Sequence, residues 1–210
     1  MITKEKYGFK KGQLFIFEGP DNVGKSTIAK KILNQLLKEK IKAKYISFPG
    51  KDTNLFGKKI YNLHHQLYHL HEQVNPLSIQ LLHIASHINI LENEIKNLLN
   101  ENYIILLDRF WWSTWVYGKL KNINSKMLNS AIDIELIFWK NIKINSIFLF
   151  DFPKPYGNIK NLEEWNNIRS LYNQLKRKSD EKIIIIDQYL SYSTINNHIL
   201  NSLKSAKFII

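Results

Sequence analysis

A glycine-rich segment near the N-terminus carries the clearest chemical signal in this sequence. Residues 19–26 read Gly-Pro-Asp-Asn-Val-Gly-Lys-Ser, which satisfies every fixed position of the phosphate-loop pattern G-x-x-x-x-G-K-S/T. Its two glycines allow the backbone to curl, so that several N–H groups converge on one phosphate. Lys25 can reach the outer phosphates of a nucleotide, and the Ser26 hydroxyl can ligate Mg²⁺. The segment therefore predicts a nucleotide-phosphate site.

The flanks of this loop support the same interpretation. Residues 13–17 form a short apolar run that is typical of a strand, and apolar residues recur at helical spacing over 27–38. A strand, a glycine loop and a helix in this order are the context in which the motif binds phosphate. The alternative is an unrelated glycine turn before a helix. We expect ATP to contact Gly19, Asp21, Asn22, Val23, Gly24, Lys25, Ser26 and Thr27.

A second polar pair follows an apolar run in the middle of the chain. Residues 103–107 are predicted to form a buried strand, and Asp108 and Arg109 come directly after it. A carboxylate at such a strand end can help to hold hydrated Mg²⁺, and an arginine can grip a phosphate with two hydrogen bonds. The alternative is a surface Asp–Arg pair. With the phosphate loop upstream, we predict that Ser26 and Asp108 bind the metal and that Lys25, Asp108 and Arg109 are catalytic.

The rest of the chain alternates between apolar strands and amphipathic helices. The further strands are predicted at 43–48, 146–150 and 182–186, and the further helices at 55–70, 75–99, 125–140, 162–178 and 193–204. Five short strands separated by helices predict an α/β fold, in which helices cover both faces of a five-stranded parallel sheet. Ligands of such sheets bind beyond the carboxyl ends of the strands. The phosphate loop, Phe48, Asp108 and Asp187 all fall at such ends. We find no repeat or linker, and expect one domain over residues 1–210.

Composition narrows the classes of partner. The formal net charge of +12 favours a polyanionic partner, either a nucleotide or a nucleic acid. The basic residues are scattered rather than clustered with exposed aromatics, so we do not expect a nucleic-acid surface. Zero cysteines exclude disulfides and thiol chemistry. The sequence has no apolar run of roughly 18 residues and no signal-peptide core, so we expect a cytoplasmic protein without a membrane partner.

Three segments together resemble the thymidylate kinase family. They are Phe17-Glu-Gly-Pro-Asp-Asn-Val-Gly-Lys-Ser-Thr27, Phe48-Pro49 and Asp108-Arg-Phe-Trp-Trp-Ser113, and residues 81–87 align with the family's long helix. The resemblance implies a P-loop nucleoside monophosphate kinase fold with a short lid at about 151–161. It implies transfer of the ATP γ-phosphoryl group, with Mg²⁺, to a (deoxy)nucleoside monophosphate such as dTMP. It also implies a homodimer through helices within 55–99 and 125–140.

The acceptor site that the resemblance implies combines residues from the three segments. Asp21 is expected near the 3′-hydroxyl of the acceptor sugar, and Arg109 near the acceptor phosphate. Phe48 is expected near the base, while Ser113 and Tyr117 contact the acceptor or line its pocket. Core packing is the alternative for the aromatic residues, including Trp111 and Trp112.

The sequence departs from the family pattern in the acceptor site. Lys51 stands where the family usually has an arginine on the acceptor phosphate. His83 and His87 replace an aromatic residue that stacks on thymine and an arginine that faces the base. They are four residues apart and therefore share one face of a helix. Imidazoles can stack and form hydrogen bonds, so we include both in the acceptor site, but the preferred base stays open. The alternative is that both are ordinary helix-face residues.

The second departure concerns charge on the transferred phosphoryl group. The family places an arginine in the phosphate loop or in the lid, whereas this loop has Asn22 and residues 151–161 have no arginine. The nearest basic candidates are Lys154, Lys160 and Arg169. Two alternatives to a dTMP kinase therefore stay open. They are a kinase for another nucleoside or nucleoside monophosphate, and a catalytically weak nucleotide-binding module.

Overall fold

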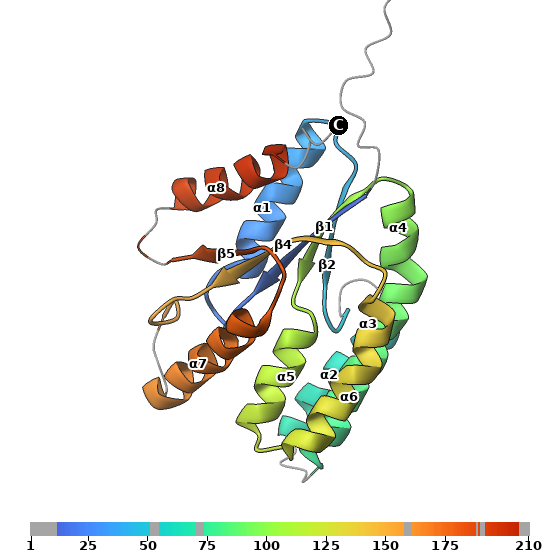
Figure 1. Cartoon of the computed structure of the whole chain (residues 1–210), viewed down its shortest axis with the longest axis vertical. Helices are drawn as coiled ribbons and strands as arrows, with labels where there is room; N and C mark the ends of the chain where they lie inside the picture. Colours follow the sequence, from blue (N-terminus) through green and yellow to red (C-terminus); the bar gives the residue numbers. More distant parts are fainter. Residues whose placement is uncertain are drawn as a thin grey trace, which may run out of the picture.

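A parallel β-sheet forms the centre of the fold (Figure 1). The structure is a computed structural model that describes residues 12–50, 55–69, 74–157, 161–187, 189 and 192–205. Within these residues, five strands lie side by side in the order β2-β3-β1-β4-β5, and every neighbouring pair is parallel. The strands are β1 Gln13–Glu18, β2 Ala43–Ser47, β3 Ile104–Asp108, β4 Ile144–Phe150 and β5 Ile183–Ile186. The predicted five-stranded parallel sheet is confirmed.

The helices follow the predicted order with two differences. They are α1 Lys25–Lys38, α2 Leu55–His69, α3 Pro76–Ile90, η1 Leu91–Ile95, α4 Lys96–Asn100, α5 Trp111–Leu120, α6 Ser125–Trp139, α7 Leu162–Lys178 and α8 Tyr192–Ser205. The predicted helix over 75–99 is α3, which continues through the π-helical turn η1 into α4. The sequence analysis predicted no helix at α5, because its apolar residues surround the whole helix and leave no amphipathic period. None of the described helices is both long and apolar enough to cross a membrane.

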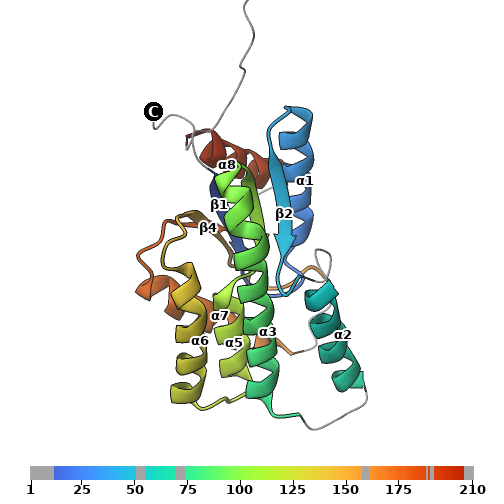
Figure 2. The same ribbon diagram turned by 90° about the vertical axis from the view of Figure 1, so that its right-hand side faces the viewer.

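Helices cover both faces of the sheet (Figures 1 and 2). Alternate strand residues face opposite sides, so Phe15 and Phe17 pack with α1 and α8, whereas Leu14 and Ile16 pack with α3, α5 and α7. Trp112 is 1% exposed and lies in the second of these cores, as its core-packing alternative predicts. The helical layer on that side extends beyond the sheet, where α2, α3, α5 and α6 lie together (Figure 2).

The strand order brings three predicted site segments to one edge of the sheet. β3 lies between β1 and β2, and Asp108 is in register with both Phe17 and Ser47. The phosphate loop after β1, Phe48 after β2 and Arg109 after β3 are therefore neighbours. Asp187 follows β5, which is the edge strand farthest from β2, and it does not line the cavity described below.

Candidate active site

The phosphate loop turns tightly between β1 and α1. Gly19 has φ 133°, and a Cβ there would lie 2.5 Å from the Phe150 carbonyl oxygen, so no side chain fits. Gly24 has φ 82° and caps α1 directly before Lys25. The positive end of the α1 dipole therefore points into the loop, which favours an anion at this place.

Lys25 is buried inside the loop. Its Nζ donates to the carbonyl oxygens of Gly19, at 3.0 Å, and of Pro20. Burial, and then the positive charge of Arg109, lower the pKa of Lys25 to about 8. A polyphosphate would supply the negative charge that this buried ammonium lacks. The geometry therefore suits a lysine that binds the outer phosphates of a nucleotide.

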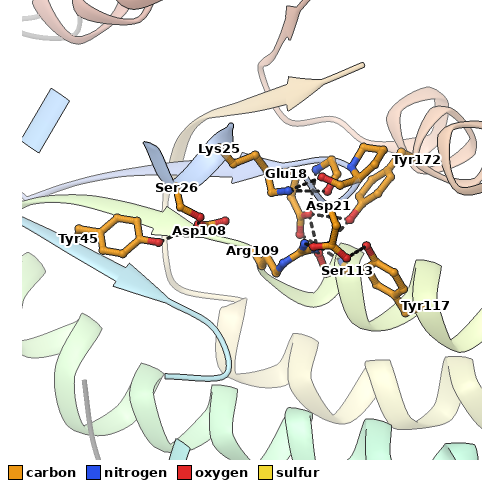
Figure 3. A network of polar contacts seen from close by, with 12 residues as sticks. Glu18, Asp21, Lys25, Ser26, Tyr45, Asp108, Arg109, Ser113, Tyr117 and Tyr172 are labelled. Carbon is orange, nitrogen blue, oxygen red and sulfur yellow. Dashed lines mark hydrogen bonds and ion pairs between the residues drawn. The ribbon is translucent and has the colours of Figure 1, made fainter. Parts of the chain in front are cut away.

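Asp108 ends β3 with one oxygen bound and the other without a partner. Its Oδ2 accepts hydrogen bonds from the Tyr45 hydroxyl, at 2.8 Å, and from the Ser26 hydroxyl (Figure 3). Its Oδ1 is buried and has no hydrogen-bond partner among the described residues. A hydrated divalent cation would satisfy that oxygen, and Mg²⁺ prefers carboxylate and hydroxyl oxygens. The residues present therefore fit the predicted metal site.

Arg109 connects the phosphate loop to helix α5. Its φ of 76° is uncommon for a residue with a side chain, and its backbone N–H donates to the Phe17 carbonyl at 2.9 Å. The guanidinium pairs with Asp21 and donates to the Ser113 hydroxyl at 2.7 Å. It lies 5.5 Å from the centre of the Tyr117 ring, and the Tyr117 hydroxyl donates to Asp21 at 2.6 Å. The four side chains form one cluster beside the phosphate loop (Figure 3).

Glu18 anchors this cluster from below through hydrogen bonds. The sequence analysis assigned it no role. The carboxylate is fully buried and accepts from the backbone N–H groups of Phe110, at 2.8 Å, and Ser113, at 3.1 Å. The hydroxyls of Ser113 and Tyr172 donate to its Oε2 at 2.8 and 3.0 Å. Burial raises the pKa of Glu18, while the charge of Arg109 opposes that rise. Glu18 thereby holds the start of α5, which carries Ser113 and Tyr117.

One cavity of about 990 Å³ joins the phosphate loop to the predicted acceptor residues. Among its lining residues are predicted site residues from every segment that the structure describes: Asp21, Asn22, Gly24, Lys25, Ser26, Thr27, Phe48, His83, His87, Asp108, Arg109, Ser113 and Tyr117. Gly19 and Val23 do not line it, and the Val23 side chain is buried in the core. Lys51 lies outside the described residues.

The far end of the cavity is aromatic and rich in histidine. His87 is 3% exposed and stacks on Phe48, with ring centres 4.0 Å apart and planes 14° apart. His83 Nε2 lies 3.1 Å from His64 Nδ1 on α2. Burial, with the charges of His87 and His64, lowers the pKa of His83 well below its usual range. Both predicted histidines thus face the cavity, which favours a ligand role over the helix-face alternative.

The sequence analysis assigned several cavity residues no role in the site. Tyr61, His64 and His65 line the cavity from α2, and Gln80 lines it from α3. Tyr45 holds Asp108 from the middle of β2. Nothing in the sequence separates these residues from ordinary helix or strand positions. Only the packing of α2 on α3, and the register of β2 with β3, brings them to the site.

Two of the three basic candidates near the predicted lid, Lys154 and Arg169, do not line the cavity. Arg169 lies on α7 and its Nε donates to Asp151 at 2.7 Å, while Lys154 is exposed and Lys160 lies outside the described residues. The segment predicted to be a lid contacts the loop, because the Tyr156 backbone N–H donates to the Asn22 carbonyl at 2.8 Å. Lys30 and Lys121 line the cavity instead.

A phosphate loop and a strand-end carboxylate lie at one end of the cavity, and an aromatic, histidine-rich region lies at the other. This arrangement defines a P-loop nucleotide kinase fold. The family model of thymidylate kinase matches residues 17–135, more than half of the chain. A thymidylate kinase of Thermosipho africanus is 30% identical over 182 residues, which cover 80% of this chain and 87% of the relative.

Two further relatives extend the match. Thymidylate kinases of Mycoplasmoides gallisepticum and Ureaplasma parvum serovar 3 are 27% and 26% identical, covering 91% and 88% of this chain and 94% and 86% of the relatives. The chain belongs to the thymidylate kinase family.

Proposed function

We propose that the protein transfers the γ-phosphoryl group of ATP to a deoxynucleoside monophosphate, with dTMP as the preferred acceptor. The observation that carries this proposal is the shared cavity, which is lined by the phosphate loop, including Asp21, and by Arg109 and Phe48. A donor and an acceptor held in one cavity react as parts of one complex, which is the main source of rate in phosphoryl transfer.

On the donor side, the loop backbone and the start of α1 bind the phosphates, and Lys25 moves from its two carbonyl partners to the outer phosphates. Ser26 and Asp108 would hold Mg²⁺, with Tyr45 fixing the Asp108 carboxylate. When bound, Mg²⁺ neutralises charge that develops on the phosphates. Release of ADP leaves the γ-phosphoryl group on the acceptor.

On the acceptor side, Arg109 binds the phosphate of the monophosphate and Asp21 the 3′-hydroxyl of its sugar. Ser113 and Tyr117 already hold these two side chains in place. The attacking atom is a phosphate oxygen of the acceptor, which is ionised at neutral pH, so no general base is required. Phe48, His83 and His87 surround the base, and Lys51 is a further candidate for the acceptor phosphate.

One observation favours a second candidate function, a nucleotide-binding module with slow transfer. Asn22 occupies the loop position of the family arginine, and Arg169 is already paired with Asp151. An arginine that neutralises the transferred group contributes about 10³–10⁵ in rate. If a lysine such as Lys30 does not replace it, turnover is slow while binding stays intact.

A panel of acceptors tests the proposed class of substrate. ADP formation from ATP and Mg²⁺ should be stimulated by dTMP at least about tenfold more than by thymidine, because Arg109 requires a phosphate partner. The panel would also contain dUMP, dCMP, dGMP and the corresponding nucleosides. Stronger stimulation by thymidine than by dTMP would replace this proposal with a nucleoside kinase.

The homodimer is a further proposal, supported by apolar side chains on the outer faces of α2, α3 and α6. Their exposed members are Leu55, Phe56, Leu63, Leu81, Met127, Ile134 and Ile137, of which Ile137 is 70% exposed. A shallow pocket lined by Leu77, Leu81, Met127, Ala131 and Ile134 joins α3 to α6. Apolar groups concentrated on neighbouring helices are typical of an isologous interface.

Light scattering at micromolar concentration should give a mass of twice 24.9 kDa. Ile134→Lys should yield the monomer, because it places a charge within the apolar face. Leu37→Lys on α1, also at an exposed leucine but on the other side of the sheet, should remain dimeric. A monomeric wild-type protein would refute the dimer.

A further inference from the structure

Glu18 is the last residue of β1, and the phosphoryl-transfer proposal gives it no part. We propose that Glu18 is a positioning residue that aims the Arg109 guanidinium at the acceptor phosphate, and that Tyr172 on α7 holds Glu18 in place. Arg109 is the partner of that phosphate in the proposed function, on which this inference rests. Neither Glu18 nor Tyr172 lines the cavity, so both act through other side chains.

The backbone at Arg109 is held from the end of β1. Its φ of 76° is uncommon for a residue with a side chain, and such a conformation persists only where its surroundings fix it. The N–H of Arg109 donates to the Phe17 carbonyl at 2.9 Å, and the N–H of Phe110 donates to Glu18 Oε1 at 2.8 Å. The two peptide groups that flank Arg109 are thus each fixed by a residue of β1, and Glu18 supplies one of these contacts.

The Ser113 hydroxyl transmits the position of Glu18 to the guanidinium. It donates to Glu18 Oε2 at 2.8 Å, and the Ser113 backbone N–H donates to Oε1 at 3.1 Å. A hydroxyl has a single proton, so its lone pairs face other neighbours. Arg109 Nη1 donates to the same Ser113 oxygen at 2.7 Å. The acceptor at Glu18 Oε2 therefore sets the direction of the hydroxyl, and with it the place of the guanidinium.

Tyr172 links the same carboxylate to α7. Its side chain is 1% exposed, and its hydroxyl donates to Glu18 Oε2 at 3.0 Å and lies 2.9 Å from Ser113 Oγ. On the same helix, Arg169 Nε donates at 2.7 Å to Asp151, which directly follows β4. Hydrogen bonds thus connect α7, through Glu18 and Ser113, to the side chain that is proposed to bind the acceptor phosphate.

Replacement of Glu18 by glutamine separates position from charge. Oε1 accepts two backbone N–H groups, so the amide oxygen should take its place and the amide nitrogen that of Oε2. That nitrogen donates where the carboxylate accepts, so the Ser113 hydroxyl has to turn and no longer presents the same lone pair to Arg109. The loss of a negative charge near Arg109 would by itself favour an anion. Weaker binding of the acceptor phosphate is therefore the result that a positioning role predicts and the charge change alone does not.

Calorimetry with dTMP and thymidine tests the inference, because these two ligands differ in the phosphate alone. In Glu18→Gln the dissociation constant of dTMP should rise about tenfold, whereas that of thymidine should change less than about twofold. In an Arg109→Lys background the same substitution should change the dTMP constant less than about threefold, because Glu18 then has no guanidinium to aim. Tyr172→Phe, which keeps the carboxylate and removes one donor, should raise the dTMP constant about threefold and leave that of thymidine unchanged.

The matched control is Trp165→Phe, on the same helix as Tyr172. Trp165 is buried in the core on the α1 side of the sheet, and its indole N–H donates to the Phe152 carbonyl at 3.0 Å, so this variant also loses one hydrogen bond. It should change neither dissociation constant. Equal weakening of dTMP and thymidine in Glu18→Gln, or tighter binding of dTMP, would overturn the inference.

A second readout needs no nucleotide. The N–H groups of Phe110 and Ser113 should exchange slowly with deuterium in the wild type, and at least about tenfold faster in Glu18→Gln. Rapid exchange of both groups in the wild type would also overturn the inference, because Glu18 would then not hold them. Binding and exchange are both measured without turnover. Wild-type protein that binds dTMP but never phosphorylates it would therefore count against the proposed function alone.

Discussion

Lys25→Ala is expected to reduce phosphoryl transfer to dTMP at least about 100-fold, as measured by ADP formation at saturating ATP and dTMP. In the proposed donor site the ammonium of Lys25 binds the outer phosphates, and alanine offers no substitute for it. The fold should persist, because the lysine contributes only two hydrogen bonds to loop carbonyls and pays a desolvation cost for its burial.

Thermal unfolding separates loss of chemistry from loss of fold. The midpoint of the Lys25→Ala protein should lie within a few degrees of the wild type. Lys38→Ala, at the exposed end of the same helix, should keep full activity. Near-normal transfer by a well-folded Lys25→Ala protein would contradict the assignment of the loop as the donor site.

Arg109→Lys is expected to raise the apparent KM for the acceptor about 10–100-fold, although the charge is kept. The arginine fork can hold Asp21 and Ser113 and still present an N–H to phosphate, whereas a lysine supplies a point charge. The apparent KM for ATP should change much less, because we propose that the loop backbone, Lys25 and Ser26 bind the donor.

Arg177→Lys provides the matched control, since Arg177 is exposed near the end of α7. It should leave both KM values unchanged. If Arg109→Lys shifted the KM of ATP and the acceptor equally, Arg109 would serve the donor or the whole cavity rather than the acceptor phosphate.

The donor half of the site could be predicted because its signals are local. Glycines, a lysine and a hydroxyl at fixed spacing form the phosphate loop, and a carboxylate directly after an apolar strand locates Asp108. The strands themselves are short apolar runs, which is how strands covered on both faces appear in sequence. Helix α5 was missed because its tryptophans and its valine are spread around the helix, so the sequence shows no amphipathic period there.

The acceptor half depends on contacts between residues far apart in the chain. Glu135 meets His87 across 48 positions, and Tyr172 meets Glu18 across 154. Neither carboxylate has a sequence pattern that distinguishes it from a surface residue, since its burial follows from how helices pack on each other. His83 and His87 were found only because a family resemblance singled out their positions, and their partners became visible in the folded chain.

Conversion of dTMP by the purified wild-type protein tests the central claim most directly. With ATP, Mg²⁺ and dTMP, phosphorus-31 NMR should show dTDP and ADP appearing in equal amounts, with no release of inorganic phosphate. That outcome requires the donor loop and the acceptor pocket to work as one site. A protein that binds ATP and dTMP but forms no dTDP would contradict the account and establish a nucleotide-binding module on the same fold.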